Sequence, residues 1–115
     1  MRKLYIVKTN QDFEKIIKDG KCIKNKYFVI HHLSNNLKYD RFGISVSKKL
    51  GNAVFRNKYK RKIRSIINNY KKLYINNEDY IIILRKEAIN LDYNILEKEL
   101  IALLNINKKG YNYEK

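Results

Sequence analysis

The chain has 115 residues and a formal net charge of +15 at pH 7, because 26 lysines and arginines stand against 11 aspartates and glutamates. Such an excess predicts a polyanionic partner, either a nucleic acid or a membrane surface. No segment approaches the roughly 20 apolar residues of a membrane-spanning helix, and residues 1–6 lack the apolar region of a secretion signal, so we expect a cytoplasmic protein that does not act on a membrane.

The first predicted element is a short helix over residues 11–19. Asn10 is a favourable cap for the acidic residues that follow it, and Gly20 can end the helix. The apolar residues of this segment recur at helical spacing and form one stripe, which consists of Phe13, Ile16 and Ile17. One side of the helix can therefore pack against another element.

Two strands are predicted next, a short one near Cys22 and a longer one over residues 26–33. In the longer strand, Tyr27, Val29 and His31 share one face, and Phe28, Ile30 and His32 share the other. The two histidines therefore cannot act as a side-by-side catalytic pair. Cys22 is the only cysteine, which excludes an internal disulfide, and we interpret it as a small buried hydrophobic residue.

Turn-forming residues at 34–40 lead into a predicted strand over residues 41–47. One face of this strand is apolar, with Phe42, Ile44 and Val46. The other face carries only small groups, namely Gly43, Ser45 and Ser47. A face of small side chains leaves room for another group to lie on it.

Gly51 and Asn52 break this strand and start a long basic helix, which we place at residues 53–73. Helical spacing gathers one basic, polar side, which consists of Arg56, Asn57, Lys60, Arg61 and Arg64. The apolar side consists of Tyr59, Ile63, Ile66, Ile67 and Tyr70. Guanidinium groups can bind phosphate through paired hydrogen bonds, and lysines add charge. The helix therefore predicts one buried face and one phosphate-binding face.

After a polar turn at residues 76–79, the apolar run at 80–84 is typical of a strand buried on both faces and reached by a helical crossover. Asp92 can cap a last helix, and residues 109–115 form a basic tail that we expect to be mobile. Residues 1–115 are thus predicted to form one α+β domain, a single α-β-β-β-α-β-α sandwich with a mixed four-stranded sheet packed by helices.

The sequence offers little for catalysis by the protein alone. Nucleases commonly gather carboxylates around a metal ion, but Glu97 and Glu99 point apart on their helix, and Glu78 and Asp79 fall in the predicted turn. Phosphate-loop, dinucleotide-binding and nucleophile-elbow motifs are all missing. No catalytic or metal-binding residue is predicted, and a free-standing protein nuclease is disfavoured.

Aromatic rings provide a different chemistry, because exposed rings stack on unpaired bases. The candidates for such a platform are Phe13, Tyr27 and His31. For Phe13, packing in the core is the competing interpretation.

The segment FGISVSKKLGNAVFRNKYKRKIR closely resembles the protein subunit of bacterial ribonuclease P, the ribonucleoprotein that removes the 5′ leader from precursor tRNA. The segments NQDFEKIIKDGK, KYFVIHHL and DYIIILRK also fit that family. The resemblance runs from about Leu4 to Lys108. It implies a fold like that of ribosomal protein S5 domain 2, with a left-handed crossover around the basic helix.

The resemblance also implies that the partner RNA is the catalyst, and that the protein belongs to an endoribonuclease holoenzyme without cutting RNA alone. Mg²⁺ would be held mainly by that RNA and by substrate phosphates, with no organic cofactor and no obligate protein partner. The residues implied to contact the catalytic RNA are Arg56, Asn57, Lys60, Arg61 and Arg64. A cleft for the leader of precursor tRNA would use Phe13, Ile17, Val29, His31, Ser45, Ser47 and Lys48.

Three positions depart from the family pattern. Lys58 stands where a second arginine is usual and so loses the bidentate guanidinium fork, while Ile17 and His31 stand where aromatic residues are frequent. Charge alone also fits a ribosomal protein or a general RNA chaperone that uses the same basic face, and this remains the alternative function.

Overall fold

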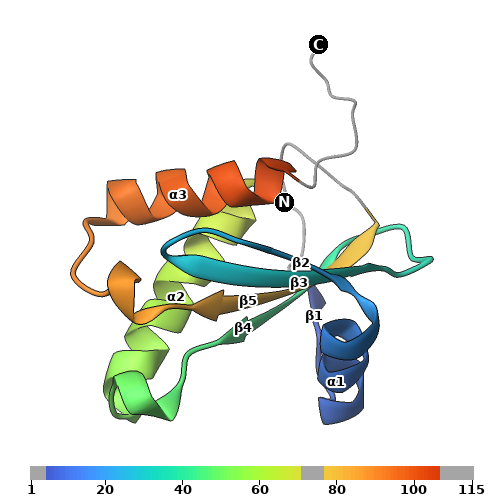
Figure 1. Ribbon diagram of the computed structural model, residues 1–115, viewed down its shortest axis with the longest axis horizontal. Helices are drawn as coiled ribbons and strands as arrows, with labels where there is room; N and C mark the ends of the chain where they lie inside the picture. The colour runs from blue at the N-terminus through green and yellow to red at the C-terminus, as the bar shows by residue number, and fades with distance from the viewer. Residues whose placement is uncertain (1–4, 71–76, 107–115) are drawn as a thin grey trace.

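Within residues 5–70 and 77–106, which the computed structural model describes, a mixed five-stranded sheet forms the centre of the fold (Figure 1). The strands are β1 (Tyr5–Ile6), β2 (Lys21–Lys24), β3 (Phe28–Ser34), β4 (Arg41–Ser45) and β5 (Glu78–Leu84), in the spatial order β1-β4-β5-β3-β2. The helices are α1 (Asn10–Asp19), α2 (Ala53–Tyr70) and α3 (Tyr93–Ile106), with 3-10 turns at Lys48–Leu50 and Lys86–Ala88.

The crossover predicted from the apolar run at 80–84 is confirmed. β4 and β5 are parallel neighbours joined through α2, while β3 pairs antiparallel with both β5 and β2. Central β5 is buried along nearly its whole length. A strand covered on both faces needs apolar side chains on both, which explains its unbroken run of isoleucines.

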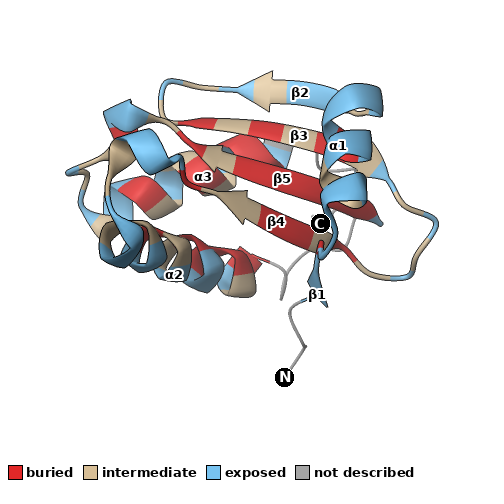
Figure 2. Cartoon of the chain, turned by 90° about the horizontal axis from the view of Figure 1, so that it is seen from below, coloured by how far each residue is buried: buried red, intermediate tan, exposed pale blue. Residues whose placement is uncertain are grey.

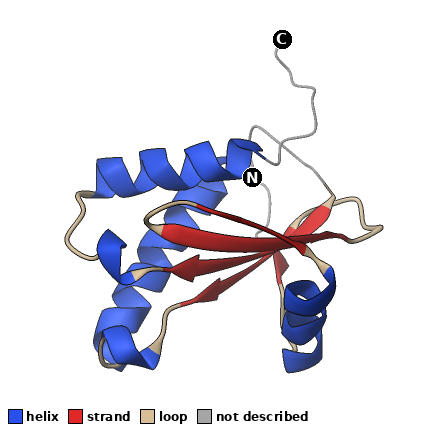
Figure 3. Cartoon of the chain, viewed as in Figure 1, coloured by secondary structure: helices blue, strands red, loops and turns tan. Residues whose placement is uncertain are grey.

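The sheet is packed by helices on both faces, as Figures 1 and 3 show. The face toward α2 and α3 carries the main core, which includes Phe28, Ile30, Phe42, Tyr80 and Ile82. On the opposite face α1 buries a smaller cluster, formed by Val7, Ile16 and Ile81 with Phe13, Leu33 and Ile83 at its margin. The larger layer anchors α2, and the smaller one leaves part of the sheet open.

The ends of several predicted elements differ in the structure. Strand β1 is an addition to the predicted four strands, and it pairs in parallel with β4. Helix α1 is capped by Thr9 rather than Asn10, because the Thr9 hydroxyl oxygen accepts a hydrogen bond of 3.1 Å from the backbone N–H of Asp12. Strand β4 ends at Ser45, and the predicted helix residues 71–73 and the tail at 109–115 lie outside the described residues.

Two predictions about individual side chains were also wrong. Cys22 is exposed, because it lies in β2 at the edge of the sheet rather than in the core. Glu78 and Asp79 are not in a turn but begin β5, where both are buried. Their carboxylates can be buried because they receive hydrogen bonds or ion pairs from β3, from β4 and from the loop that joins β3 to β4.

Candidate nucleic-acid interface

The long basic helix α2 divides into the two predicted faces. Its start is capped by Asn52, whose side-chain oxygen accepts a 2.9 Å hydrogen bond from the N–H of Phe55. The five predicted apolar residues are all buried against the sheet and α3. On the other side Asn57, Arg61 and Arg64 are exposed, and Arg56 and Lys60 are half-buried. We call these last five residues the basic face of α2.

Arg56 differs from its neighbours on this face. Its Nε atom is buried and has no hydrogen-bond partner among the described residues. A buried N–H group without an acceptor is costly, and the cost is larger for a charged group. A phosphate oxygen is an acceptor suited to a guanidinium group, but it cannot reach a buried Nε atom, so Arg56 is distinguished on this face by its partial burial and not by a free donor.

The second candidate surface is the face of the sheet that α1 covers only in part (Figure 2). Strand register aligns one row of residues under and beside α1, namely Cys22, His31, Ile81 and Gly43. The next row consists of Lys24, Val29, Ile83 and Ser45, which we call the open strip. Ile81 is fully buried, whereas Val29, Ile83 and Ser45 are only half-buried. The open strip therefore remains accessible beside the helix.

The orientation of α1 decides which of its side chains border the open strip. Asp12 and Lys15 line a pocket on the side of the loop at residues 35–40. Phe13 and Ile17 lie on the opposite flank of the same helix, where Phe13 is half-buried over Gly43 and Ile17 is 45% exposed. The structure thus brings Phe13, Ile17, Val29, His31 and Ser45 together on one side of the sheet.

Ser47 and Lys48 lie just beyond the end of β4, whereas the predicted strand extended to Ser47. Ser47 caps the 3-10 turn at Lys48–Leu50, its hydroxyl oxygen accepting a 3.1 Å hydrogen bond from the N–H of Lys49. Both residues are exposed. They belong to the segment that joins Ser45, at the end of β4, to the start of α2. This segment therefore connects the open strip to the basic face.

The aromatic platform is smaller than predicted. Tyr27 comes before β3 and packs against the main core on the α2 side, so it does not join Phe13. His31 does lie on the α1 side, opposite Cys22 of β2. Partial burial, and then the neighbouring His32, lower the pKa of His31 below its ordinary value.

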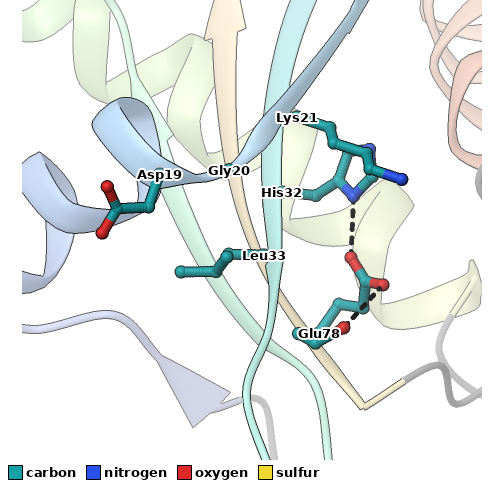
Figure 4. Close-up of a pocket in the computed structure, with 7 residues that line it drawn as sticks. Asp19, Gly20, Lys21, His32, Leu33 and Glu78 are labelled. Atoms are coloured by element: carbon teal, nitrogen blue, oxygen red, sulfur yellow. Dashed lines mark hydrogen bonds and ion pairs between the residues drawn. The ribbon is translucent and has the colours of Figure 1, made fainter.

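A buried polar network lies at the start of β5, and the sequence pattern did not predict it. His32 Nδ1 lies 2.7 Å from a carboxylate oxygen of Glu78, beside a pocket of about 240 Å³ (Figure 4). Asp40 accepts a 2.8 Å hydrogen bond from the backbone N–H of Glu78, and Asp79 binds Arg41. These contacts tie the loop at 35–40 to the sheet, which is a structural role.

In residues 5–70 and 77–106, histidine, cysteine, aspartate and glutamate side chains form no group of three or more that could hold a metal ion. Within the same ranges, no helix combines the length and the apolar character needed to cross a membrane.

Comparison with known proteins gives a consistent result. The family model described as Ribonuclease P matches residues 1–108. The ribonuclease P protein component of Streptococcus agalactiae is 48% identical over 106 residues, which is 92% of this chain and 96% of that protein. That of Streptococcus pneumoniae is 44% identical over 94% of this chain and 88% of its own length.

Solved structures agree with the sequence relatives. The ribonuclease P protein of Staphylococcus aureus is 40% identical, with a TM-score of 0.82 over 90% of this chain and 95% of that one. The Thermotoga maritima protein is 32% identical, with a TM-score of 0.84 over 94% of this chain and 100% of that one. The similarity therefore extends over nearly the whole domain, including both candidate surfaces.

Proposed function

Because the chain belongs to the ribonuclease P protein family, which implies a role in tRNA processing, we propose that it is the protein cofactor of a ribonuclease P ribozyme. In this role it binds the catalytic RNA and the 5′ leader of precursor tRNA and promotes removal of the leader. The observation that carries the proposal is the division of α2, whose apolar side is buried in the core while its basic side stays open to a polyanion.

The basic face of α2 is the proposed contact with the catalytic RNA. Its guanidinium groups can bind phosphate oxygens through paired hydrogen bonds, and Arg61 and Arg64 are exposed for such contacts. Lys58, which replaces an arginine of the family pattern, is exposed on α2 but lies outside this face. We therefore expect a substitution of Lys58 to weaken binding of the catalytic RNA less than a substitution of Arg61.

The proposed leader site is formed by the open strip with Phe13, Ile17, His31, Ser47 and Lys48 around it. Its floor is apolar or small at Val29, Ile83 and Ser45, with the exposed Lys24 at one end and the exposed Lys48 at the other. An unpaired strand can place bases on such a floor and phosphates near the lysines. Only precursor tRNA has a leader, so this site would separate the precursor from the mature product.

Catalysis would reside in the RNA, with Mg²⁺ bound mainly by RNA and substrate phosphates. The chain's own residues then bind and orient RNA, and no proton transfer or metal coordination is assigned to them.

Reconstitution tests the proposed function directly. Protein, its cognate ribonuclease P RNA and precursor tRNA are combined at low Mg²⁺, and release of the leader is measured. We expect the protein to stimulate cleavage by the RNA and to leave the substrate intact when the RNA is omitted. A protein that binds many structured RNAs equally and gives no stimulation would instead be a general RNA chaperone.

A pair of variants tests the assignment of α2. Arg61→Ala should weaken assembly with the catalytic RNA and reduce the slope of log affinity against log salt by about 0.7 for a single-stranded contact, or about 0.9 for a helical one. Lys98→Ala, on the exposed side of α3, is the matched control and should leave both values nearly unchanged. Equal losses from the two variants would mean that net charge, not the basic face, drives assembly.

A further inference from the structure

A second aromatic feature lies at the opposite side of α1 from the open strip. The ring of Tyr5 in β1 is stacked on the ring of Tyr39, which lies in the loop before β4. The ring centroids are 3.9 Å apart, and the angle between the ring planes is 26°. Tyr5 is still 38% exposed, and its neighbour Ile6 is 37% exposed. The stacked pair is therefore partly accessible at the edge of the sheet.

These rings line a pocket of about 440 Å³, a volume within the range of sites that hold small organic groups. Its walls come from β1, the start of α1 and the start of β4. They consist of Tyr5, Ile6, Lys8, Thr9, Asp12, Tyr39 and Arg41. A flat aromatic wall with an adjacent cation is the combination that binds an unpaired nucleotide.

Some of the charged side chains in the pocket already pair with one another. Arg41 hydrogen-bonds Asp79 through Nε at 2.8 Å and through Nη2 at 2.5 Å, and its Nη1 lies 3.7 Å from Asp12. Its charge is thus shared by two carboxylates. Lys8 is exposed and makes no ion pair with the described residues. Lys8 is therefore the cation left to meet a phosphate.

We propose that this pocket binds an unpaired nucleotide of the precursor tRNA leader, with the base stacked on Tyr5 and the phosphate near Lys8. The inference rests on the proposed function and extends it to a second leader contact. It would be reached only by leaders long enough to pass α1, which crosses the sheet between the pocket and the open strip (Figure 2). We call this pocket the Tyr5 site.

The position of the Tyr5 site favours the leader over the catalytic RNA. The site lies in the layer of α1, on the same side of the sheet as the open strip. The basic face belongs to α2, which packs on the other side (Figure 1). A strand that lies on the open strip is therefore closer to the Tyr5 site than an RNA docked on α2.

The test compares precursor tRNAs in the holoenzyme assembled on the catalytic RNA. One carries a leader of about ten nucleotides, within the lengths that single-strand-binding folds cover, and the other a leader too short to pass α1. Tyr5→Leu should weaken binding of the long-leader precursor about fivefold or more and leave the short-leader precursor unchanged. Tyr5→Phe keeps the ring and should restore the wild-type affinity.

Lys8→Gln provides a second test that does not touch the packing of the rings. It should reduce the salt slope by about 0.7 for the long leader only. Lys98→Gln on α3 is the matched control for loss of one exposed positive charge. Reduced slopes for long leader, short leader and mature tRNA alike would overturn the proposal.

Two further results would also overturn the Tyr5 site. One is unchanged long-leader binding by both Tyr5→Leu and Lys8→Gln. The other is weaker assembly with the catalytic RNA in the absence of substrate, which would make the pocket part of the RNA-subunit interface. Failure of the proposed function has a different signature, because the wild-type protein would then give no stimulation of leader removal at all.

Discussion

The ring of Phe13 lies directly against Gly43 in β4. A Cβ atom at Gly43 would come 2.6 Å from Cζ of Phe13 and 3.0 Å from Cδ1 of Ile81. Since real Cβ atoms essentially never approach closer than 3.0 Å, a side chain at this position would force the Phe13 ring to move. The small face predicted for this strand therefore has two parts, one filled by Phe13 at Gly43 and one left open at Ser45.

Gly43→Ala should force Phe13 away from the sheet and destabilise the fold. Overpacking of a tight contact costs about 1–3 kcal/mol, which we expect as a loss in the free energy of unfolding measured by urea denaturation. Ser45→Ala, two residues along on the same face, is the control and should change stability by less than about 0.5 kcal/mol. Similar losses from both variants would show that the contact with Phe13 is not the cause.

Asp79 connects β5 to the loop and to β4, so its replacement should loosen three segments at once. Its carboxylate accepts hydrogen bonds from Arg41 and a further bond of 2.9 Å from the side chain of Asn35. The hydrogen bonds that Arg41 donates to Asp79 raise the pKa of Arg41. The arginine also stays charged when Asp79 is removed, because the ordinary pKa of a guanidinium group lies far above neutral. Asp79→Asn should cost about 1–3 kcal/mol, because part of this energy is screened at the partly exposed arginine.

Urea denaturation at neutral pH measures the effect of Asp79→Asn. Glu14→Gln is the control, because it removes one carboxylate from an exposed position on α1. Both variants lose one negative charge, so the global charge change is identical. If the two lose equal stability, the buried network contributes nothing beyond net charge.

The sequence predicts most of the elements because local patterns determine them. The isoleucine run of β5, the two faces of α2 and the stripe of Phe13, Ile16 and Ile17 each reflect one buried surface. The failures arise where partners come from distant parts of the chain. Glu78 and Asp79 look like turn residues until His32 and Arg41 are placed beside them.

The candidate sites show the same division between local and distant information. Periodicity along one helix is enough to predict the basic face of α2. The row that joins Val29 to Ser45 depends on β5 lying between β3 and β4, which no local pattern reveals. The stacking of Tyr5 on Tyr39 depends likewise on β1, a two-residue strand too short to give a periodic signal.

Ile17→Phe should strengthen the binding of precursor tRNA. Ile17 is 45% exposed on the flank of α1 that borders the open strip, so a larger ring can be accommodated without entering the core. An aromatic ring can stack on a base, which an isoleucine cannot, and one such contact corresponds to about fivefold tighter binding or more. Mature tRNA, which has no leader, should bind as before.

The matched control for this gain is Ile95→Phe on α3. Ile95 is 42% exposed and lies in the helical layer on the other face of the sheet. Equilibrium binding of precursor and mature tRNA to the two holoenzymes gives the comparison. Equal tightening by both variants would indicate nonspecific aromatic contact and would remove Ile17 from the leader site.

His31 should make the protein less stable on the acidic side of neutrality. Its pKa in the folded state is lowered by partial burial and by His32, so the unfolded chain binds a proton more readily. Stability is therefore unaffected by this group well above pH 6.5, and it falls as pH decreases from 6.5 through the lower folded-state pKa. His31→Gln removes the titrating ring and with it this part of the loss.

Thermal melts of the wild type and His31→Gln between about pH 8 and pH 5 measure this difference. The two melting temperatures should keep a constant offset at the alkaline end and converge or cross as the wild type loses stability at the acidic end. Because the two proteins differ only at residue 31, the pH-dependent part of the difference in melting temperature reports the loss of the His31 ring. A constant offset across the whole range would mean that His31 binds protons equally in the folded and unfolded chains.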